Sequence, residues 1–154
     1  MNYIGYVNSL IKSKVAERKP LVMFGQNVAA GSCIGGLTRG LKSGDGHLVL
    51  NTPNCENALV GTGFGLMLNG VSSIFFMKQQ DFLLLGIDQL VNTYNLIRGR
   101  KEVSSFTIVN VVVDSGYEGP QSCLNNFPDF CSIARIPGYT ITNKYDGAKI
   151  IDAH

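Results

Sequence analysis

The run Phe106–Val113 is the feature that most limits how this chain can fold. It is rich in β-branched residues, carries no charge and lacks a regular alternation of polar and apolar positions. A strand of this kind is buried on both faces, as in parallel sheets that are covered by helices. Similar shorter runs predict three further strands at Leu21–Phe24, His47–Leu50 and Val71–Phe76.

Segments with helical periodicity separate these runs. Apolar residues recur at a spacing near 3.6 in an N-terminal segment that ends near residue 17, in the segment that follows Pro53, and in a segment that lines up Leu83, Leu84, Ile87, Leu90, Val91, Tyr94 and Ile97 on one face. The alternation of strands and helices predicts an α/β fold: a mainly parallel sheet with helices on both faces.

The C-terminal part of the chain is less regular. Asp114–Asp129 contains glycines, prolines and polar side chains, and we expect a loop there. We expect short strands at Cys131–Ile136 and Tyr139–Thr142, followed by a last helix over Tyr145–Ala153.

Composition sets broad limits on the function. The chain has 154 residues, of which 45% are hydrophobic and 16% charged, so we expect residues 1–154 to form a single domain with a substantial core. A net charge of +2, with scattered basic residues, argues against binding to nucleic acid or to an anionic membrane surface. No apolar run reaches the roughly 18 to 20 residues that span a bilayer, and the N-terminus lacks the apolar core of a signal peptide, so we expect a cytoplasmic protein.

The cysteines do not form a metal or disulfide pattern. Cys33, Cys55, Cys123 and Cys131 show no CxxC spacing, so we expect free thiols, two or three of them buried, and no metal site in this chain.

Three short motifs invite assignments that we reject. Gly44-Asp45-Gly46 is a turn rather than a diphosphate-binding GDG, because Asn51 follows too soon after it. The glycines between Gly61 and Gly65 lie inside a predicted helix, whereas a dinucleotide-binding motif closes a strand. His47 and His154 have no partners that would make a Ser-His-Asp triad.

The segment from Asn51 to Glu56 joins a predicted strand to a predicted helix. Asn51, Thr52 and Asn54 are residue types that cap helix N-termini, and Pro53 suits a first helical turn. Glu56 therefore lies in the first turn, at the carboxyl end of a strand. Such a carboxylate commonly does no more than complement the positive end of the helix dipole.

Three polar segments follow predicted strands: Asn54–Glu56, Gln79–Phe82 and Ser115–Cys123. Because the carboxyl ends of parallel strands line one edge of a sheet, these segments can converge. A carboxylate, the aromatic ring of Phe82 and a polar loop would together form a pocket for a flat heteroaromatic ligand. Ordinary helix packing is the alternative role for Phe82.

Five segments carry a resemblance to a known family. The residues Asn51-Thr52-Pro53, Glu56, Val60-Gly61 and Gly65 resemble the motif DTPLSExxIVGxxxG, and Asp81–Asn92 resembles DYxxxxFDQIVN. Three shorter matches follow in the same order, at Gly119-Pro120-Gln121, Ile136-Pro137-Gly138 and Tyr145-Asp146. The five segments are similar to segments of the beta subunits of pyruvate and branched-chain 2-oxo acid dehydrogenases. The chain therefore resembles the pyrimidine-binding domain of transketolase-like thiamine diphosphate enzymes.

The resemblance implies roles for individual residues. Glu56 would hydrogen-bond N1′ of the aminopyrimidine ring of thiamine diphosphate and be the catalytic carboxylate, and Phe82 would stack on that ring. Asn54, Cys55 and Gln79 would also line the cofactor. The chain departs from the family at Gln79, which replaces a frequent aromatic residue.

On the substrate side, the resemblance points to Gln121 and Ser122. Ser122 replaces the histidine of the family motif GPQHS, so acid–base help would come from elsewhere or the chemistry would differ.

The resemblance also implies a partner, because a pyrimidine-binding domain holds only half of the cofactor. We expect a separate diphosphate-binding subunit that supplies the Mg²⁺ ligands, assembled with this chain as a heterotetramer. The expected reaction cleaves or forms a C–C bond next to a carbonyl, by decarboxylation of a 2-oxo acid with acyl transfer or by ketol transfer between sugars. Two alternatives stay open: a non-catalytic homologue that acts as an assembly or regulatory partner, and a stand-alone nucleotide-binding α/β protein.

Overall fold

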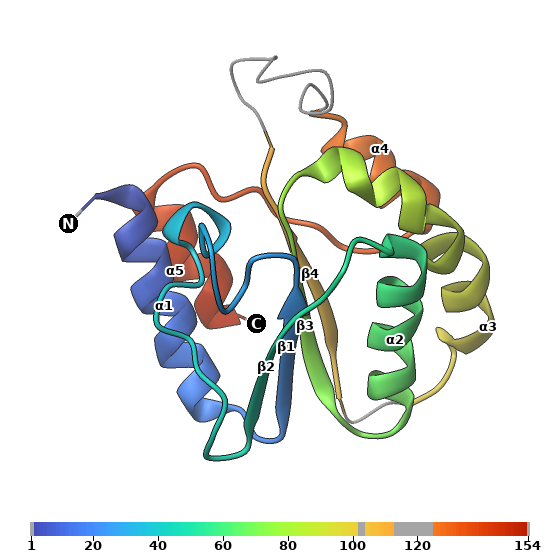
Figure 1. The fold of residues 1–154 in the computed structure, drawn as a ribbon. Coiled ribbons are helices and arrows are strands. Elements are labelled where there is room, and N and C mark those ends of the chain that lie inside the picture. The colour runs from blue at the N-terminus through green and yellow to red at the C-terminus, as the bar shows by residue number, and fades with distance from the viewer. Residues whose placement is uncertain (1, 102–103, 113–124, 154) are drawn as a thin grey trace.

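A computed structural model describes residues 2–101, 104–112 and 125–153 (Figure 1). Its centre is a four-stranded sheet in the order β2-β1-β3-β4, in which every pair of neighbouring strands is parallel. The strands are β1 (Leu21–Gly25), β2 (His47–Asn51), β3 (Ser72–Met77) and β4 (Phe106–Asn110). The sheet confirms the predicted α/β class, and all four expected strands are present.

Helices cover both faces of this sheet, as the sequence predicts. Figure 1 shows α1 (Tyr3–Glu17) and α5 (Lys144–Ala153) on one side, and α2 (Glu56–Leu68), α3 (Tyr94–Ile97) and α4 (Phe127–Ala134) on the other. Shorter helical segments are η1 (Ile34–Gly36), η2 (Gln80–Gly86) and η3 (Gln89–Thr93).

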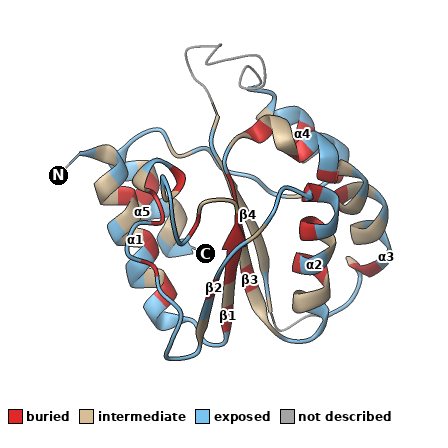
Figure 2. Ribbon diagram, viewed as in Figure 1, coloured by how far each residue is buried: buried red, intermediate tan, exposed pale blue. Residues whose placement is uncertain are grey.

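Each face of the sheet has its own core. Met23 and Phe76 face α1 and α5, while Phe24 and Phe75 face α2 and the helical segments that follow β3. The rings of Phe24 and Phe75 stack at a centroid distance of 5.2 Å. Figure 2 shows buried residues along the strands and on the sides of the helices that face them. Neighbouring positions on β1 and β3 therefore serve opposite cores, which requires strands that are apolar throughout.

The strand predicted at Cys131–Ile136 is wrong, because these residues largely belong to α4. Pro128 lies in the first turn of this helix, and Arg135 ends it in a left-handed conformation with φ of 54°. Phe130 and Ala134, four residues apart, are its buried side chains. A short apolar run alone does not distinguish a strand from a buried helix.

The strand predicted at Tyr139–Thr142 is also wrong. These residues have no regular structure and run alongside α1, where the Tyr3 hydroxyl donates a hydrogen bond of 2.6 Å to the carbonyl of Ile141. The side chains of Thr142 and Asn143 then bond to Asp146, which fixes the start of α5. The last predicted helix is confirmed.

β4 is shorter than its apolar run predicts. It ends at Asn110 and forms the edge of the sheet among the described residues, and each of its residues is half-buried rather than buried on both faces. Its Phe106 ring packs against Gly63 of α2, where no side chain would fit. The edge position explains why the burial is only partial.

The segment from residue 80 to residue 97 is helical, but it is not one regular α-helix. η2 is a 3₁₀-helix, η3 is π-helical, and only α3 is α-helical. Leu83, Leu90 and Ile97 are buried as predicted, whereas Leu84 is 55% exposed. A 3₁₀-helix has three residues per turn, so it turns some positions of an α-helical stripe away from the core.

The expectation for the cysteines has an outcome in the described part of the chain. Cys33, Cys55 and Cys131 are free thiols, but none of them is buried, so the expectation of two or three buried cysteines fails for these three. Cys123 lies outside the described residues. Among the residues that the structure describes, none of the helices is both long and apolar enough to cross a membrane.

Candidate functional site

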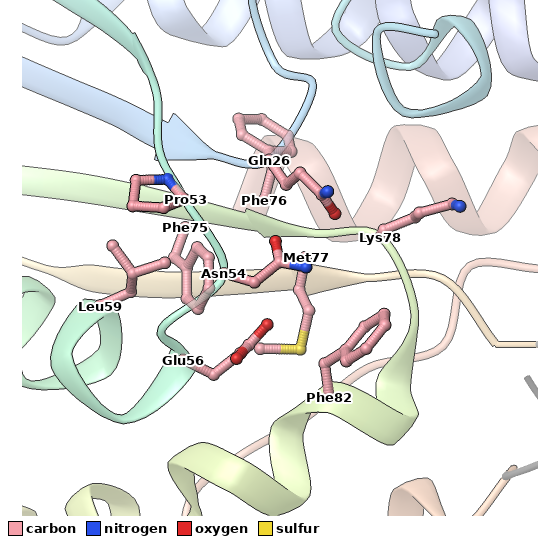
Figure 3. A pocket seen from close by; sticks show the side chains of 10 residues that line it. All are labelled: Gln26, Pro53, Asn54, Glu56, Leu59, Phe75, Phe76, Met77, Lys78 and Phe82. Atoms are coloured by element: carbon pink, nitrogen blue, oxygen red, sulfur yellow. The ribbon is translucent and has the colours of Figure 1, made fainter. Parts of the chain in front are cut away.

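The candidate site is a small hollow at the carboxyl ends of β1, β2 and β3. Gly25, the last residue of β1, pairs with Asn51 at the end of β2 and with Phe76 near the end of β3, so the three strands end together. Ten residues line the hollow (Figure 3): Gln26, Pro53, Asn54, Glu56, Leu59, Phe75, Phe76, Met77, Lys78 and Phe82. Parallel topology thus brings together residues that lie far apart in the sequence.

Glu56 is the first residue of α2, as predicted, and it is 7% exposed. Figure 3 shows its carboxylate pointing into the hollow between Asn54 and Phe82. The carboxylate makes no hydrogen bond or ion pair with another residue of the described chain. Its place in the first turn of α2 puts the carboxylate at the positive end of the helix dipole, which favours a negative charge there. The side chain is therefore free to accept a hydrogen bond from a group that enters the hollow.

The expected helix cap is wrong. The N-cap residue of α2 is Cys55, which is exposed and makes no capping hydrogen bond with its side chain. Asn51 instead accepts a hydrogen bond of 2.8 Å from the backbone N–H of Ala29. Pro53 lies before the helix rather than in its first turn, and it lines the hollow. The strand-to-helix connection is thus longer than the capping pattern predicts.

Phe82 enters the site from η2 and is half-buried. The anchor of this segment is Gln80, which is fully buried. Its backbone N–H donates a 2.9 Å hydrogen bond to the carbonyl of Val111, and its side-chain oxygen accepts one of 3.0 Å from the backbone N–H of Asn126. Gln80 thus ties η2 to the end of β4 and to the start of α4. Sequence reasoning missed it, because a glutamine beside polar neighbours indicates an exposed position.

The structure brings together some of the predicted cofactor residues but not all of them. Asn54, Glu56 and Phe82 line the hollow, whereas Cys55 and Gln79 lie next to lining residues in the chain without lining it themselves. Gln121 and Ser122 lie outside the described residues, as does the loop segment Ser115–Cys123. The lining residues that sequence reasoning missed are Gln26, Pro53, Leu59, Phe75, Phe76, Met77 and Lys78. Several of these end strands β1 and β3 or directly follow them, which is the signal that could have found them.

The hollow is too small to enclose a ring by itself. Its volume is about 10 Å³, close to what one water molecule requires. Lys78 is exposed at its margin, and in Figure 3 its ammonium group lies away from the Glu56 carboxylate. The described residues therefore present one wall of a binding site, with an acceptor and an aromatic ring side by side.

Gly44-Asp45-Gly46 lies near the amino end of β2, at the opposite end of the strands from the candidate site. Gly44 bridges to His47, where β2 begins, whereas the candidate site lies where β2 ends. The Asp45 carboxylate pairs with Lys19 at the surface. This glycine-rich segment is a turn, as predicted. The described residues contain no cluster of three or more His, Cys, Asp or Glu side chains placed to hold a metal ion.

Curated proteins with similar sequences share one description, although no family model matches the chain. The chain is 28% identical over 92 residues to the beta subunit of mitochondrial 2-oxoisovalerate dehydrogenase from Chaetomium thermophilum, an alignment that covers 60% of the chain and 20% of the relative. It is 28% identical over 101 residues to the corresponding Bacillus subtilis subunit, covering 65% and 31%. It is 35% identical over 86 residues to chloroplastic pyruvate dehydrogenase E1 component subunit beta-3 from Arabidopsis thaliana, covering 55% and 21%.

The chain is a homologue of 2-oxo acid dehydrogenase beta subunits. This confirms the resemblance that the five sequence segments indicate, and the all-parallel sheet between two layers of helices fits it. The matches span about a fifth to a third of the length of these relatives. In this homologue, the strongest sequence motif, Asn51 to Gly65, builds the wall that carries Glu56, and the second, Asp81 to Asn92, carries Phe82.

Proposed function

We propose that this homologue is the pyrimidine-binding part of a split, transketolase-like thiamine diphosphate enzyme, with residues 1–154 acting as one pyrimidine-binding domain. The observation that carries the proposal is the Glu56 carboxylate, which is 7% exposed, has no partner in the described chain and faces a hollow beside an aromatic ring. A carboxylate in this position can accept a hydrogen bond from a ring nitrogen of a bound cofactor. That bond would supply the partner that Glu56 lacks in the described chain.

The residues present fit an aminopyrimidine ring in two respects. Glu56 offers the acceptor for a ring nitrogen, and the half-buried Phe82 offers a flat apolar surface on which a heteroaromatic ring can stack. Asn54 adds an amide at the same margin. Cys55 and Gln79 flank these residues in the chain and would contact the cofactor only at its periphery.

The chain's own chemistry at this site would be proton positioning. When bound, thiamine diphosphate supplies a carbon nucleophile for reactions next to a carbonyl group. Glu56 would hold a proton at N1′ of the aminopyrimidine, and Phe82 would fix the plane of the ring. The apolar floor of Phe75, Phe76 and Met77 would keep water away from the carboxylate, which strengthens that hydrogen bond.

A second polypeptide would complete the site. The hollow has room for about one water molecule, so another surface must enclose most of the cofactor. We propose a separate diphosphate-binding subunit that supplies the Mg²⁺ ligands, assembled with this chain as a heterotetramer. The substrate of the assembled enzyme would be a small 2-oxo acid, as the names of the relatives suggest, or a sugar. Gln121 and Ser122 stay proposed substrate contacts.

The test is Glu56→Gln in the assembled pair. The chain is co-purified with a diphosphate-binding subunit that carries a GDG motif and a downstream asparagine. Turnover of 2-oxo acids is then measured with a dye as electron acceptor, and thiamine diphosphate binding is followed by calorimetry in the presence of Mg²⁺. We expect turnover to fall by at least about 100-fold, because general acid–base groups contribute about 10² to 10⁴. Asn57→Asp, an exposed change on the same helical turn, is the control for a change of charge at the start of α2 that leaves Glu56 in place.

The same measurement separates the proposal from its main alternative. A non-catalytic homologue that acts as an assembly or regulatory partner would support the same turnover with glutamine at position 56 as with glutamate. A stand-alone nucleotide-binding protein would bind a nucleotide without the second subunit, which calorimetry with ATP on the isolated chain would reveal. Either result would overturn the proposed function.

A further inference from the structure

A second and larger hollow lies outside the candidate site. It has a volume of about 670 Å³ and runs between the helical segment that follows β3 and helix α4. Figure 1 shows α4 beside this segment on the α2 side of the sheet. Nine residues line the groove: Leu84, Ile87, Asp88, Val91, Asn92, Asn126, Asp129, Phe130 and Ile133.

The spacing of these residues gives the groove its shape. On each wall the lining residues recur three and four positions apart, from Leu84 to Asn92 on one and from Asn126 to Ile133 on the other. Each wall is therefore one face of a helical segment, and two such faces form a groove into which a third helix can pack. Phe130 is buried, while Leu84 and Ile133 are 55% and 58% exposed. The groove thus has a buried aromatic floor and apolar rims.

The polar groups of the groove carry one sign of charge. Asp88 accepts a hydrogen bond of 2.7 Å from Asn92, and Asp129 accepts one of 2.9 Å from Asn126, so each carboxylate is held by an amide of its own wall. Neither carboxylate forms an ion pair within the described chain, and none of the nine lining residues is basic. A ligand with cations on both sides of an apolar stripe would complement this arrangement.

We propose that this groove binds an amphipathic helix of another polypeptide, with its apolar face on Phe130, Leu84 and Ile133 and with Lys or Arg residues opposite Asp88 and Asp129. A second copy of this chain is a poorer fit, because it would bring the same two carboxylates to the interface. In addition, the apolar face of its longest helix, α1, is buried in its own core through Val7, Ile11 and Val15. The proposal goes beyond the proposed function and does not depend on a cofactor.

The groove adjoins the candidate site through η2. This segment carries Phe82 into the small hollow and Leu84 into the groove. Gln80 joins η2 to Asn126, which lines the opposite wall. A helix bound in the groove would therefore rest on the same segment that positions the aromatic ring of the site.

The experiment uses a fluorescein-labelled peptide of about 18 residues, long enough for five helical turns. It carries leucines at positions i, i+3, i+4 and i+7 of each repeat and lysines on both sides of that stripe. A matched peptide carries glutamates in place of the lysines. Fluorescence anisotropy measures the binding of both peptides to the full chain, and circular dichroism verifies that each variant is folded.

We expect the lysine peptide to bind at least about tenfold more tightly than the glutamate peptide. Leu84→Glu and Ile133→Glu should each weaken its binding by at least about tenfold, since they place a charge on an apolar rim. Leu96→Glu is the control, because Leu96 is 84% exposed on α3 and does not line the groove. The double variant Asp88→Lys with Asp129→Lys should reverse the preference and favour the glutamate peptide.

Several outcomes would overturn the inference. Failure of both peptides to bind, or equal binding of both, would show that the groove does not select a basic helix. An equal loss with Leu96→Glu would show that binding is not confined to the groove. Sedimentation would show a second copy as the occupant, if the wild-type chain forms a dimer and Leu84→Glu is a monomer. None of these outcomes depends on turnover, so they can be distinguished from a failure of the proposed function.

Discussion

Gly86 lies directly against the first turn of α2, which begins at Glu56. A methyl group added at Gly86 would lie 3.3 Å from the carbonyl oxygen of Glu56 and 2.8 Å from Cγ2 of Val60. The absence of a side chain at Gly86 therefore lets η2 approach α2 closely. This approach sets the distance between the two walls of the candidate site, one carrying Phe82 and the other Glu56.

Replacing Gly86 with alanine should destabilise the chain. The added methyl group has to displace either η2 or the start of α2, and overpacking of this kind costs about 1 to 3 kcal/mol. Urea unfolding followed by circular dichroism measures the change in the free energy of unfolding. In the assembled pair, the same variant should weaken thiamine diphosphate binding, because it separates Phe82 from Glu56.

Gly65→Ala is the matched control for this variant. Gly65 lies inside α2, and a methyl group there would meet no atom within 4 Å. Alanine is a better helix former than glycine, so this variant should gain about 0.5 to 1 kcal/mol. If both variants shift stability in the same direction, the close packing of Gly86 on Glu56 does not constrain the site.

Phe82→Leu tests the aromatic wall and rests on the proposed function. Leucine keeps an apolar side chain at this half-buried position but removes the ring that would stack on the aminopyrimidine. Stacking is worth about 0.5 to 1.5 kcal/mol beyond buried area, so the Kd of thiamine diphosphate for the assembled pair should rise about 2- to 10-fold. Calorimetry measures this Kd. Leu85→Ala, an exposed change in the same segment, should leave this Kd unaltered. An unchanged Kd with Phe82→Leu would show that the Phe82 ring does not contact the cofactor.

The placement of Glu56 was predictable because two local signals agree. The apolar run at His47–Leu50 reads as a strand, and the residues from Asn54 onward read as a helix, so a carboxylate at the junction must lie at a strand end. Parallel topology then sends it to the same edge as Phe82. The exact cap was not predictable, because the Asn51 side chain bonds to Ala29, which lies far away in the sequence.

The structure around α4 was not predictable from the sequence pattern. Cys131–Ile136 is too short for its period to separate a strand from a helix, and burial of Phe130 and Ala134 against the helical segments after β3 decides in favour of the helix. The burial of Gln80 likewise depends on partners at Val111 and Asn126, which no local pattern indicates. Both features were settled by tertiary contacts rather than by propensity.

Cys131 should react more slowly with iodoacetamide than Cys55. Burial raises the pKa of the Cys131 thiol above its usual value of 9.0. The thiolate is the reactive form, so at pH near 8 a raised pKa leaves less of it. Cys131 is half-buried, whereas Cys55 is exposed at the start of α2. Peptide mapping by mass spectrometry after short labelling times measures both rates. The difference should disappear in urea, and equal rates in the folded chain would contradict the burial of Cys131.

The contact between Lys19 and Asp45 should give the chain a small stability term that is lost in acid. A hydrogen bond and the charge of Lys19 lower the pKa of the Asp45 carboxyl below its ordinary value of 3.8. Because the folded state binds this proton less readily than the unfolded state, the stabilisation is present above pH 3.8 and declines as the pH falls through the lowered pKa.

Thermal unfolding of the wild type and of Asp45→Asn at a series of pH values measures this term. The Tm of the wild type should exceed that of the variant near neutral pH, and the gap should close as the pH falls through the lowered pKa of Asp45. Salt should narrow the gap, because the pair is exposed. Lys19→Met should remove the same term, and the double variant should lose no more than either single one. A gap that stays constant into acid would mean that Asp45 acts through the geometry of its turn rather than through its charge.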